Sequence, residues 1–361
     1  MALRIVKGNV LPIGVDLGTS AVKMAQLRST GDTIELLAAG AAEVPPNCKT
    51  DLQSRLSFYS TAIKNLLRSD GFNGRECVMC IPAEATFVQH VRIPKLSPDR
   101  VQEAVLRELR GKLPFPSKEA EIRHIIAGDV VAEGEPKQEV IVVAAARPSV
   151  EACLTVARRA KLDVAAVNIE PCAIVECFGR LFRRSTDQQR TILFVDLGHA
   201  STQVVLSHGH QIVFARNLNV AGQQLDKALA EALEIPEAVA HEMRRDLASG
   251  EGTVSEEEMC DLLRGALDSL ASEVTQCLRY HESVFRNHGI ERAIFLGGQA
   301  NDKRLCQSIA QRLNLPAQIG DPLVRFARVE GAGLNVGLDR RQPQPHWAVA
   351  IGLSLGGARA A

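Results

Sequence analysis

The chain has 361 residues, of which 46% are hydrophobic, which is enough to bury a sizeable core in two domains or lobes. Its 42 Lys and Arg residues balance its 42 Asp and Glu residues, and aromatic residues make up only 4% of the chain. Nucleic acid is therefore not expected as a partner, because neither a basic face nor a surface of stacking rings is indicated.

The sequence also indicates where the protein works. The N-terminal segment lacks the continuous apolar stretch of a signal peptide, and no run long enough to cross a membrane occurs. We therefore expect a soluble, cytoplasmic protein. The nine cysteines suggest no disulfide framework, and Cys77 with Cys80 has no second pair to complete a zinc site, so we expect reduced, structural thiols.

The first half of the chain is predicted to contain a lobe and an insert. Residues 13–27 are typical of a strand, a tight turn and a second strand, and a helix is expected over residues 51–68. Residues 75–165 alternate strand and helix patterns and are interpreted as an inserted α/β subdomain in the first lobe. The remainder of that lobe is assigned to residues 1–74, completed by 166–186 and 337–361.

A polar run at residues 183–190 leads into the second lobe, assigned to residues 187–336, with residues 222–289 as its helical subdomain. A hairpin is predicted to turn at Gly209, and turn chemistry explains the flanking His208 and His210 better than a metal site does. A long helical run is expected over residues 255–288, and a short apolar helix over 347–357.

One acidic turn occurs twice in the sequence. The stretch GVDLGTSAVKMAQL (14–27) returns as FVDLGHASTQVVLS (194–207), so that Asp16 and Gly18 correspond to Asp196 and Gly198. A glycine at such a bend lets backbone N–H groups approach an anion, and a carboxylate beside a polyphosphate is a suitable ligand for Mg²⁺. A single copy is better explained as an ordinary strand-end turn, but two copies favour a phosphate site.

A third glycine turn strengthens this interpretation. It is FLGGQAND (295–302), in which an apolar strand ends at Gly297 and Gly298 before a helix. Such a turn lets a flat ring or a phosphate lie against the backbone with no Cβ in the way.

The order of these features resembles that of the actin-like ATPases: phosphate turn, connecting helix at 168–177, second phosphate turn, adenosine turn and final helix. Within them, the sequence is most similar to the PilM family of type IV pilus assembly proteins, which is related to the cell-division protein FtsA. The similarity covers nearly the whole chain. The segments that carry it are GTSAVK, RIPKLSPDRVQEAVLRELRGKLPFP, VIVVAAARPSV, NIEPCAIVE and LGGQANDKRL.

The resemblance implies an α/β fold of the ribonuclease H-like, actin-like ATPase class, with two lobes around a nucleotide cleft. It implies ATP and Mg²⁺ as cofactors, with Asp16 and Asp196 near the metal and Glu170 orienting an attacking water. The residues implied to bind the nucleotide are Asp16, Gly18, Thr19, Ser20, Lys23, Asp196, Gly198, Gly222, Gln223, Lys227, Gly297, Gly298 and Gln299.

Three residues depart from the family pattern. His241 and Arg244 occupy a helix where relatives usually carry an acidic residue followed by lysine, and His199 occupies a loop position where small residues are more usual. An imidazole at position 199 would titrate near neutral pH. Groups that hold ATP are visible in the sequence, whereas groups that speed its hydrolysis are not, so slow or negligible turnover is expected.

As a member of this family, the protein would be an ATP-binding adaptor of a type IV pilus or related secretion complex. It would bind the cytoplasmic N-terminal tail of a PilN-like inner-membrane protein and other pilus assembly components, and so be peripheral to the inner membrane without inserting into it. Two alternatives remain open: an FtsA-like filament-forming ATPase, which would self-associate, and a small-molecule kinase of the same superfold.

Overall fold

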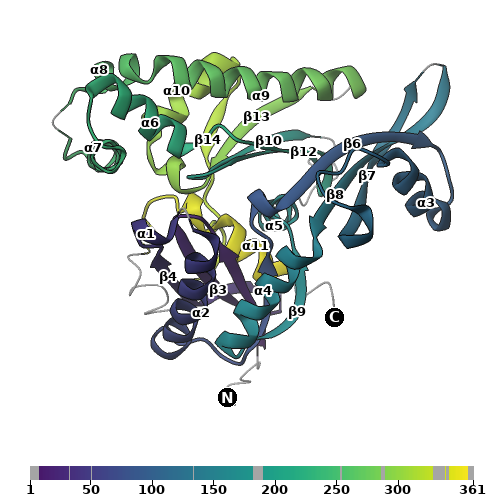
Figure 1. Ribbon diagram of the computed structural model, residues 1–361, viewed down its shortest axis with the longest axis horizontal. Coiled ribbons are helices and arrows are strands. Elements are labelled where there is room, and N and C mark those ends of the chain that lie inside the picture. The colour runs from purple at the N-terminus through teal and green to yellow at the C-terminus, as the bar shows by residue number, and fades with distance from the viewer. Residues whose placement is uncertain are drawn as a thin grey trace, which may run out of the picture. The chain divides into compact units, whose positions relative to one another are not determined.

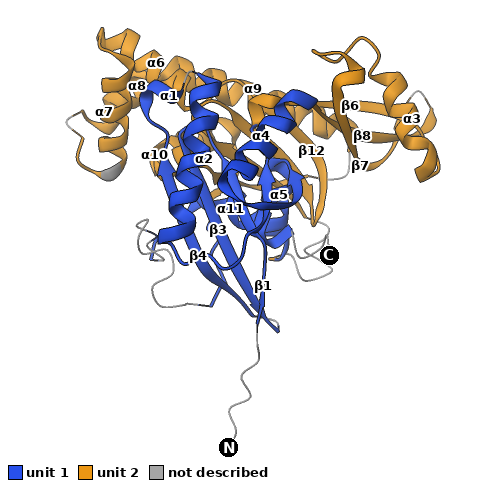
Figure 2. Ribbon diagram, turned by 60° about the horizontal axis from the view of Figure 1, so that its bottom comes forward, with its two compact units in different colours: residues 1–82, 147–180, 321–361 blue, residues 83–146, 181–320 orange. Residues whose placement is uncertain are grey.

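The computed structural model describes residues 8–31, 33–49, 51–132, 134–181, 190–252, 254–285, 289–327, 338 and 341–356. The chain divides into two units (Figures 1 and 2). The first comprises residues 1–82, 147–180 and 321–361, and the second comprises residues 83–146 and 181–320. The polar run predicted at 183–190 lies outside the described residues except for Arg190.

A mixed sheet forms the centre of the first unit, shown in blue in Figure 2, in the order β1-β3-β2-β5-β9 with β4 paired to β3. Its strands are β1 (Asn9–Val10), β2 (Ile13–Leu17), β3 (Ala21–Thr30), β4 (Thr33–Glu43), β5 (Glu76–Cys80) and β9 (Asp163–Asn168). Its helical elements are α1 (Pro46–Lys49), α2 (Leu52–Ser69), α4 (Arg147–Ala160), α5 (Glu170–Gly179), the 3₁₀ turn η6 (Pro345–Trp347) and α11 (Ala348–Gly356).

Side-chain alternation along β2 decides which helices cover which face of this sheet. Ile13, Val15 and Leu17 belong to one hydrophobic cluster with buried residues of α2 and α4. Gly14 points the opposite way, where a Cβ would overlap the backbone carbonyl of Ala350 in α11. The glycine lets α11 lie directly against the strand, and Asp16 shares this face with Gly14.

The second unit contains two sheets. A five-stranded sheet has the order β12-β11-β10-β13-β14, and a three-stranded antiparallel sheet has the order β6-β8-β7. The strands are β6 (Thr86–Pro94), β7 (Ala120–Ala132), β8 (Glu135–Ala146), β10 (Thr191–Leu197), β11 (Thr202–His208), β12 (Gln211–Leu218), β13 (Ile290–Leu296) and β14 (Ala317–Ile319). The hairpin between β11 and β12 turns at Gly209, as predicted, with φ of 58°.

Helices of the second unit pack on both sheets. They are α3 (Pro98–Glu108), α6 (Gly222–Leu233), α7 (Glu237–Ser249), α8 (Glu256–Leu262), α9 (Arg264–Val284) and α10 (Lys303–Leu313), with 3₁₀ turns η1 (Ala83–Ala85), η2 (Ser117–Glu119) and η4 (Gly298–Asn301). Residues of α6, α9 and α10 share a core with the five-stranded sheet, as the green ribbons in Figure 1 illustrate. Val101 and Val105 of α3 pack on the three-stranded sheet.

The single helix predicted over 255–288 is two helices in the structure. Ser255 caps α8 by accepting a hydrogen bond from the Glu258 N–H at 3.2 Å. The chain leaves helical geometry at Leu263, where φ is −91° and ψ is 0°, before α9 begins. His288, the expected end of the run, lies outside the described residues.

The inserted segment differs in extent from the sequence interpretation. β5 and β9 pair in parallel with each other, and β5 pairs with β2, so residues 76–80 and 163–168 complete the sheet of the first unit. Residues 83–146 instead group with residues 181–320. A five-residue strand pattern does not reveal which sheet it will join, which explains the difference between the expected boundaries and those observed.

Side-chain contacts attach the three-stranded sheet to the rest of the second unit. The carboxylate of Glu139 in β8 is fully buried and contacts the His90 ring at 3.2 Å, Arg92 Nε at 2.9 Å and the Tyr280 hydroxyl of α9. His90 Nε2 also lies 3.3 Å from the Ala215 carbonyl oxygen of β12. Burial raises the pKa of Glu139, but hydrogen bonds from these partners outweigh burial and hold it below its ordinary value.

Candidate functional site

The first acidic turn joins β2 to β3. Asp16 lies directly opposite Lys23 in the antiparallel pair, with 3.8 Å between the Lys23 Nζ and a carboxylate oxygen of Asp16. Asp16 is 7% exposed, and burial raises its pKa, while the charge and hydrogen bond of Lys23 act in the opposite direction. A bound cation would favour the ionised carboxylate, because it would offset the cost of burying the charge.

The bend itself is held by a tyrosine from α2. The Tyr59 hydroxyl donates a hydrogen bond to the Gly18 carbonyl at 3.0 Å. A Cβ at Gly18 would lie 2.9 Å from the Ala21 carbonyl oxygen, so the tight bend requires glycine there. Thr19 and Ser20 follow at the bend and are partly exposed. The turn therefore offers hydroxyl groups next to a buried carboxylate.

Parallel pairing brings further groups to the same edge of this sheet. Val15 pairs with Met79, and Met79 pairs with Val167, so Asp16, Cys80 and Asn168 follow one another across the sheet at its carboxyl edge. Glu170 begins α5 directly beyond this edge. The pKa of the Cys80 thiol is raised by burial and then by the charges of Glu170 and Asp16.

The second acidic turn is tied to the start of α6. Asp196 lies near the end of β10 and is 9% exposed. The N–H of Gly222 donates to the Gly198 carbonyl at 3.1 Å, and the N–H of Gln223 donates to the His199 carbonyl at 2.8 Å. The Gly198 N–H donates to the Ser201 carbonyl at 3.0 Å and closes the turn. The turn and the N-terminus of α6 thus form one hydrogen-bonded structure.

The third glycine turn lies against the second. β10 and β13 are parallel neighbours in which Asp196 pairs with Leu296. Gly297 has φ of 85°, and a Cβ there would overlap both the Asp196 carboxylate and the Leu197 carbonyl. Only glycine combines this backbone conformation with such close packing. Gly298 has open space where its Cβ would project, so the backbone there is accessible to a ligand.

An arginine of α7 connects these elements. Arg244 is buried and donates to the Gly222 carbonyl at 3.0 Å, to the Gln299 side-chain oxygen at 2.6 Å and to a carboxylate oxygen of Asp226. Gln299 is held so close to Gly222 that a Cβ on this glycine would lie 2.7 Å from its amide carbon. Arg244, a departure from the family pattern, therefore positions Gln299.

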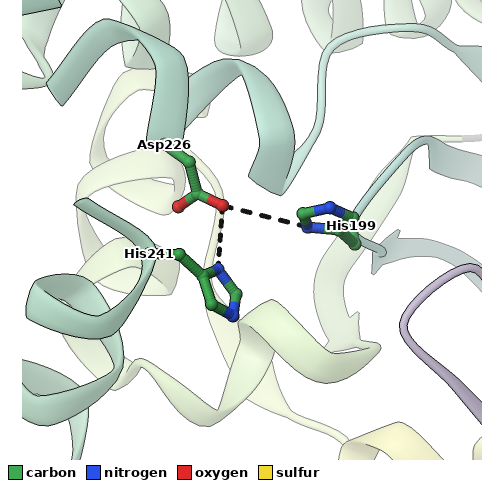
Figure 3. Close-up of side chains that lie close together, drawn as sticks. All are labelled: His199, Asp226 and His241. Carbon is green, nitrogen blue, oxygen red and sulfur yellow. Dashed lines mark hydrogen bonds and ion pairs between the residues drawn. The ribbon is translucent and has the colours of Figure 1, made fainter. Parts of the chain in front are cut away.

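Two histidines surround the other oxygen of Asp226, as Figure 3 shows. His241 Nδ1 lies 2.8 Å and His199 Nδ1 lies 3.9 Å from it. Burial raises the pKa of Asp226, but the hydrogen bond from His241 and the charge of Arg244 together hold it below its ordinary value. Asp226 is therefore an ionised, buried carboxylate at neutral pH.

The structure thus brings together most of the residues that the sequence indicated, each within its own unit. Asp16, Gly18, Thr19, Ser20 and Lys23 form the first turn, and Glu170 lies at the same sheet edge. The second unit gathers Asp196, Gly198, Gly222, Gln223, Gly297, Gly298 and Gln299.

Lys227 is the exception among these residues. It is exposed on α6, where its ion pair with Glu231 spans 3.9 Å. The inward-facing residue is its neighbour Asp226, which the sequence interpretation did not select. Helical spacing was the available signal, because Asp226 lies four residues after Gly222 and so shares its face, whereas Lys227 does not.

Comparison with known proteins identifies the family. A family model described as type IV pilus assembly protein PilM matches residues 14–358. The chain belongs to this family. The structure is similar to one described as a PilM-PilN type IV pilus biogenesis complex, at 24% sequence identity and a TM-score of 0.78, covering 96% of this chain and 98% of that chain.

A second solved structure shares the fold. The ethanolamine utilization protein EutJ from Carboxydothermus hydrogenoformans is 14% identical with a TM-score of 0.56, covering 96% of this chain and 89% of that chain. These similarities confirm the predicted actin-like ATPase fold. No helix among the described residues combines the length and hydrophobicity needed to cross a membrane.

Proposed function

We propose that the protein is an ATP-binding adaptor of the inner-membrane assembly complex of a type IV pilus or a related secretion system. Membership of the PilM family supports the pilus setting. The observation that carries the nucleotide proposal is the repeated turn: each unit contains a buried carboxylate, Asp16 or Asp196, two residues before a glycine bend at the end of a central strand.

The residues of the first turn suit a Mg²⁺-bound phosphate. Asp16 supplies a carboxylate whose burial is unfavourable without a cation, Thr19 and Ser20 supply hydroxyls, and Lys23 supplies a positive charge 3.8 Å from Asp16. Oxygen ligands of this kind are those that Mg²⁺ prefers. In this proposal Gly18 allows the phosphate to approach the backbone.

The proposal also assigns nucleotide contacts to residues of the second unit. Asp196 and Gly198 repeat the arrangement of the first turn, and Gly222 and Gln223 begin α6, whose N-terminal amides favour negative charge. The proposal assigns Gly297, Gly298 and Gln299 to the adenosine, because Gly298 leaves open space and Arg244 fixes Gln299. In this proposal Lys227 contacts the ribose and phosphates only after its ion pair with Glu231 is broken.

We propose that bound ATP acts mainly to favour one conformation and that it is hydrolysed slowly or not at all. Fast phosphoryl transfer requires a positioned water and stabilisation of the transferring charge as well as a nucleotide site. Glu170 is the residue to which we assign the orientation of water, since it begins α5 just beyond the sheet edge that carries Asp16. The expectation is that Glu170→Gln leaves ATP affinity unchanged and abolishes whatever slow turnover the wild type has.

The proposed partner is the cytoplasmic N-terminal tail of a PilN-like inner-membrane protein. The solved structure described as a PilM-PilN complex supports this choice, since it covers nearly the whole of the chain. In this proposal the protein is cytoplasmic and is held at the inner membrane through that partner, where it also contacts other pilus assembly components.

Binding of the tail to the purified protein tests this adaptor function. A labelled peptide with the N-terminal sequence of the proposed PilN-like partner is titrated with and without Mg-ATP, and a scrambled peptide serves as control. We expect saturable binding of the native tail alone, with an affinity that changes when ATP is present. Absence of peptide binding under both conditions would contradict the adaptor function.

A further inference from the structure

Three potential metal ligands converge in the second unit from separate segments of the chain. His199 follows β10, Asp226 lies in α6 and His241 lies in α7, and Figure 3 shows both rings directed at the same carboxylate. One ligand atom from each residue lies within 4.8 Å of the others. We propose that these three residues form a binding site for a transition-metal ion such as Zn²⁺, distinct from the Mg²⁺ expected with ATP.

The spacing of the ligand atoms suits such an ion after small adjustments. Ligands about 2.0–2.1 Å from a tetrahedral zinc lie about 3.3 Å from one another. The Asp226 oxygen is 2.8 Å from His241 Nδ1 and 3.9 Å from His199 Nδ1. The first contact must lengthen and the second must shorten, by about 0.5 Å and about 0.6 Å in this tetrahedral geometry. The two histidine ligand atoms, which lie within 4.8 Å of each other, must also reach this spacing.

The surroundings hold the ligands in place. Arg244 donates a hydrogen bond to the other oxygen of Asp226. This bond orients the carboxylate, as hydrogen-bonded neighbours orient metal ligands in known sites. The loop that carries His199 is fixed to α6 by the hydrogen bond from the Gln223 N–H to the His199 carbonyl. Two of the three ligands are on helices, so the site rests on regular elements of the fold.

The ligand types indicate which ions would bind. Two imidazoles and one carboxylate favour Zn²⁺, Co²⁺ or Ni²⁺, whereas Mg²⁺ and Ca²⁺ favour sites made of oxygen atoms. Asp226 is buried, and the side chain of His241 is 34% exposed, so an ion has a route to the site from solvent. Three protein ligands leave a fourth position for water or for a group of a bound molecule.

Asp226 and Arg244 form a buried ion pair at the site. Metal binding replaces the contact between His241 Nδ1 and the carboxylate with two metal–ligand bonds. In a neutral ring the proton of Nδ1 then resides on Nε2, and a doubly protonated ring releases one proton to solvent. The affinity is therefore expected to fall as the pH decreases and protons compete for the imidazoles.

Metal titration of the full-length chain tests the site without any nucleotide. The protein is stripped with chelator and desalted, and is then titrated with Co²⁺ by visible absorption and with Zn²⁺ by calorimetry. We expect one ion per chain with a tetrahedral Co²⁺ spectrum. His199→Ala and His241→Ala should each weaken binding at least about tenfold, since even indirect partners of metal ligands contribute that much.

Two further variants separate metal ligation from structural effects. His210→Ala removes an exposed histidine at the β11–β12 turn of the same unit and should bind the metal as the wild type does. His241→Gln keeps a hydrogen-bond donor for Asp226 but replaces the imidazole, so metal-free stability should be retained while metal affinity falls. Absence of Co²⁺ binding to the wild type, equal binding by His241→Gln, or a thiolate charge-transfer band showing cysteine ligation would each overturn the proposal.

Discussion

The buried ion pair between Arg244 and Asp226 gives a stability prediction whose size follows from the structure. Arg244 is 7% exposed and Asp226 is 2% exposed, and the guanidinium also donates to Gly222 and Gln299. Replacing Arg244 with Gln leaves the carboxylate charge buried with His241 as its remaining close donor. Removing one partner of a buried pair lowers the free energy of unfolding by about 3–5 kcal/mol, and we expect a loss of about 3 kcal/mol because His241 remains.

Urea unfolding followed by circular dichroism measures this loss, in the presence of chelator so that metal binding does not contribute. Arg245→Gln is the matched control, because its side chain is 65% exposed and pairs with Asp246 at 3.6 Å. Exposed pairs of this type contribute about 0–1 kcal/mol. The losses in free energy of unfolding caused by Arg244→Gln and Arg245→Gln should therefore differ by at least about 2 kcal/mol, because only Arg244 is buried.

A double-mutant cycle isolates the pair itself. Asp226→Asn combined with Arg244→Gln removes both charges, so that neither is left buried alone. The loss in free energy of unfolding of the double variant should be smaller than the sum of the two single losses, by up to about 3 kcal/mol. The reasoning is refuted if Arg244→Gln costs no more than Arg245→Gln, or if the two single losses add.

Three further outcomes are expected. Gly297→Ala should lower the free energy of unfolding by at least about 1–2 kcal/mol, because φ is 85° and the new Cβ would overlap its neighbours. Gly298→Ala, where the Cβ has open space, should change it by no more than about 0.5 kcal/mol, and thermal or urea unfolding compares the two variants. Burial and then the charge of Lys23 lower the pKa of His346 from 6.5 to about 4, so the unfolded chain takes up a proton before the folded one. Stability should therefore fall by up to about 3 kcal/mol as the pH drops through this window, and His346→Gln should flatten that dependence in unfolding measured at several pH values. Tyr280→Phe removes a hydrogen bond to the ionised Glu139 and should cost about 1.5–3 kcal/mol, and an unchanged unfolding midpoint would show that the bond contributes nothing.

Much of the fold was predictable because its signals are local. The repeated turn at Asp16 and Asp196 identified two central strands, and the glycine pattern at Gly297 identified a strand-to-helix turn; both appear in the structure as expected. Pairing between distant strands was not predictable in the same way. β5 and β9 have the same apolar pattern as the strands of the insert, and only the parallel pairing of β5 with β2 and of β9 with β5 shows that they complete the first sheet.

The part of the site that the sequence interpretation missed depends on side-chain burial. Lys227 was assigned from the family resemblance, but it faces solvent, while Asp226 beside it faces Arg244 and His241. The departures at His199, His241 and Arg244 were visible in the sequence as separate substitutions. Their common partner was not, because Asp226 lies on a different helix from His241 and in a different segment from His199, and only the fold brings these three elements together.

The most direct test of the proposed function is the affinity for Mg-ATP, measured by calorimetry on the wild type, Asp16→Ala, Asp196→Ala and the control Asp129→Ala. Asp129 is an exposed carboxylate of β7 that pairs with Lys95. We expect the wild type and the control to bind one nucleotide with equal affinity, and each of the two turn variants to lose at least tenfold, about 1.4 kcal/mol. Wild-type protein that binds no Mg-ATP, or turn variants that bind it as tightly as the wild type, would contradict the assignment of the two acidic turns to nucleotide binding.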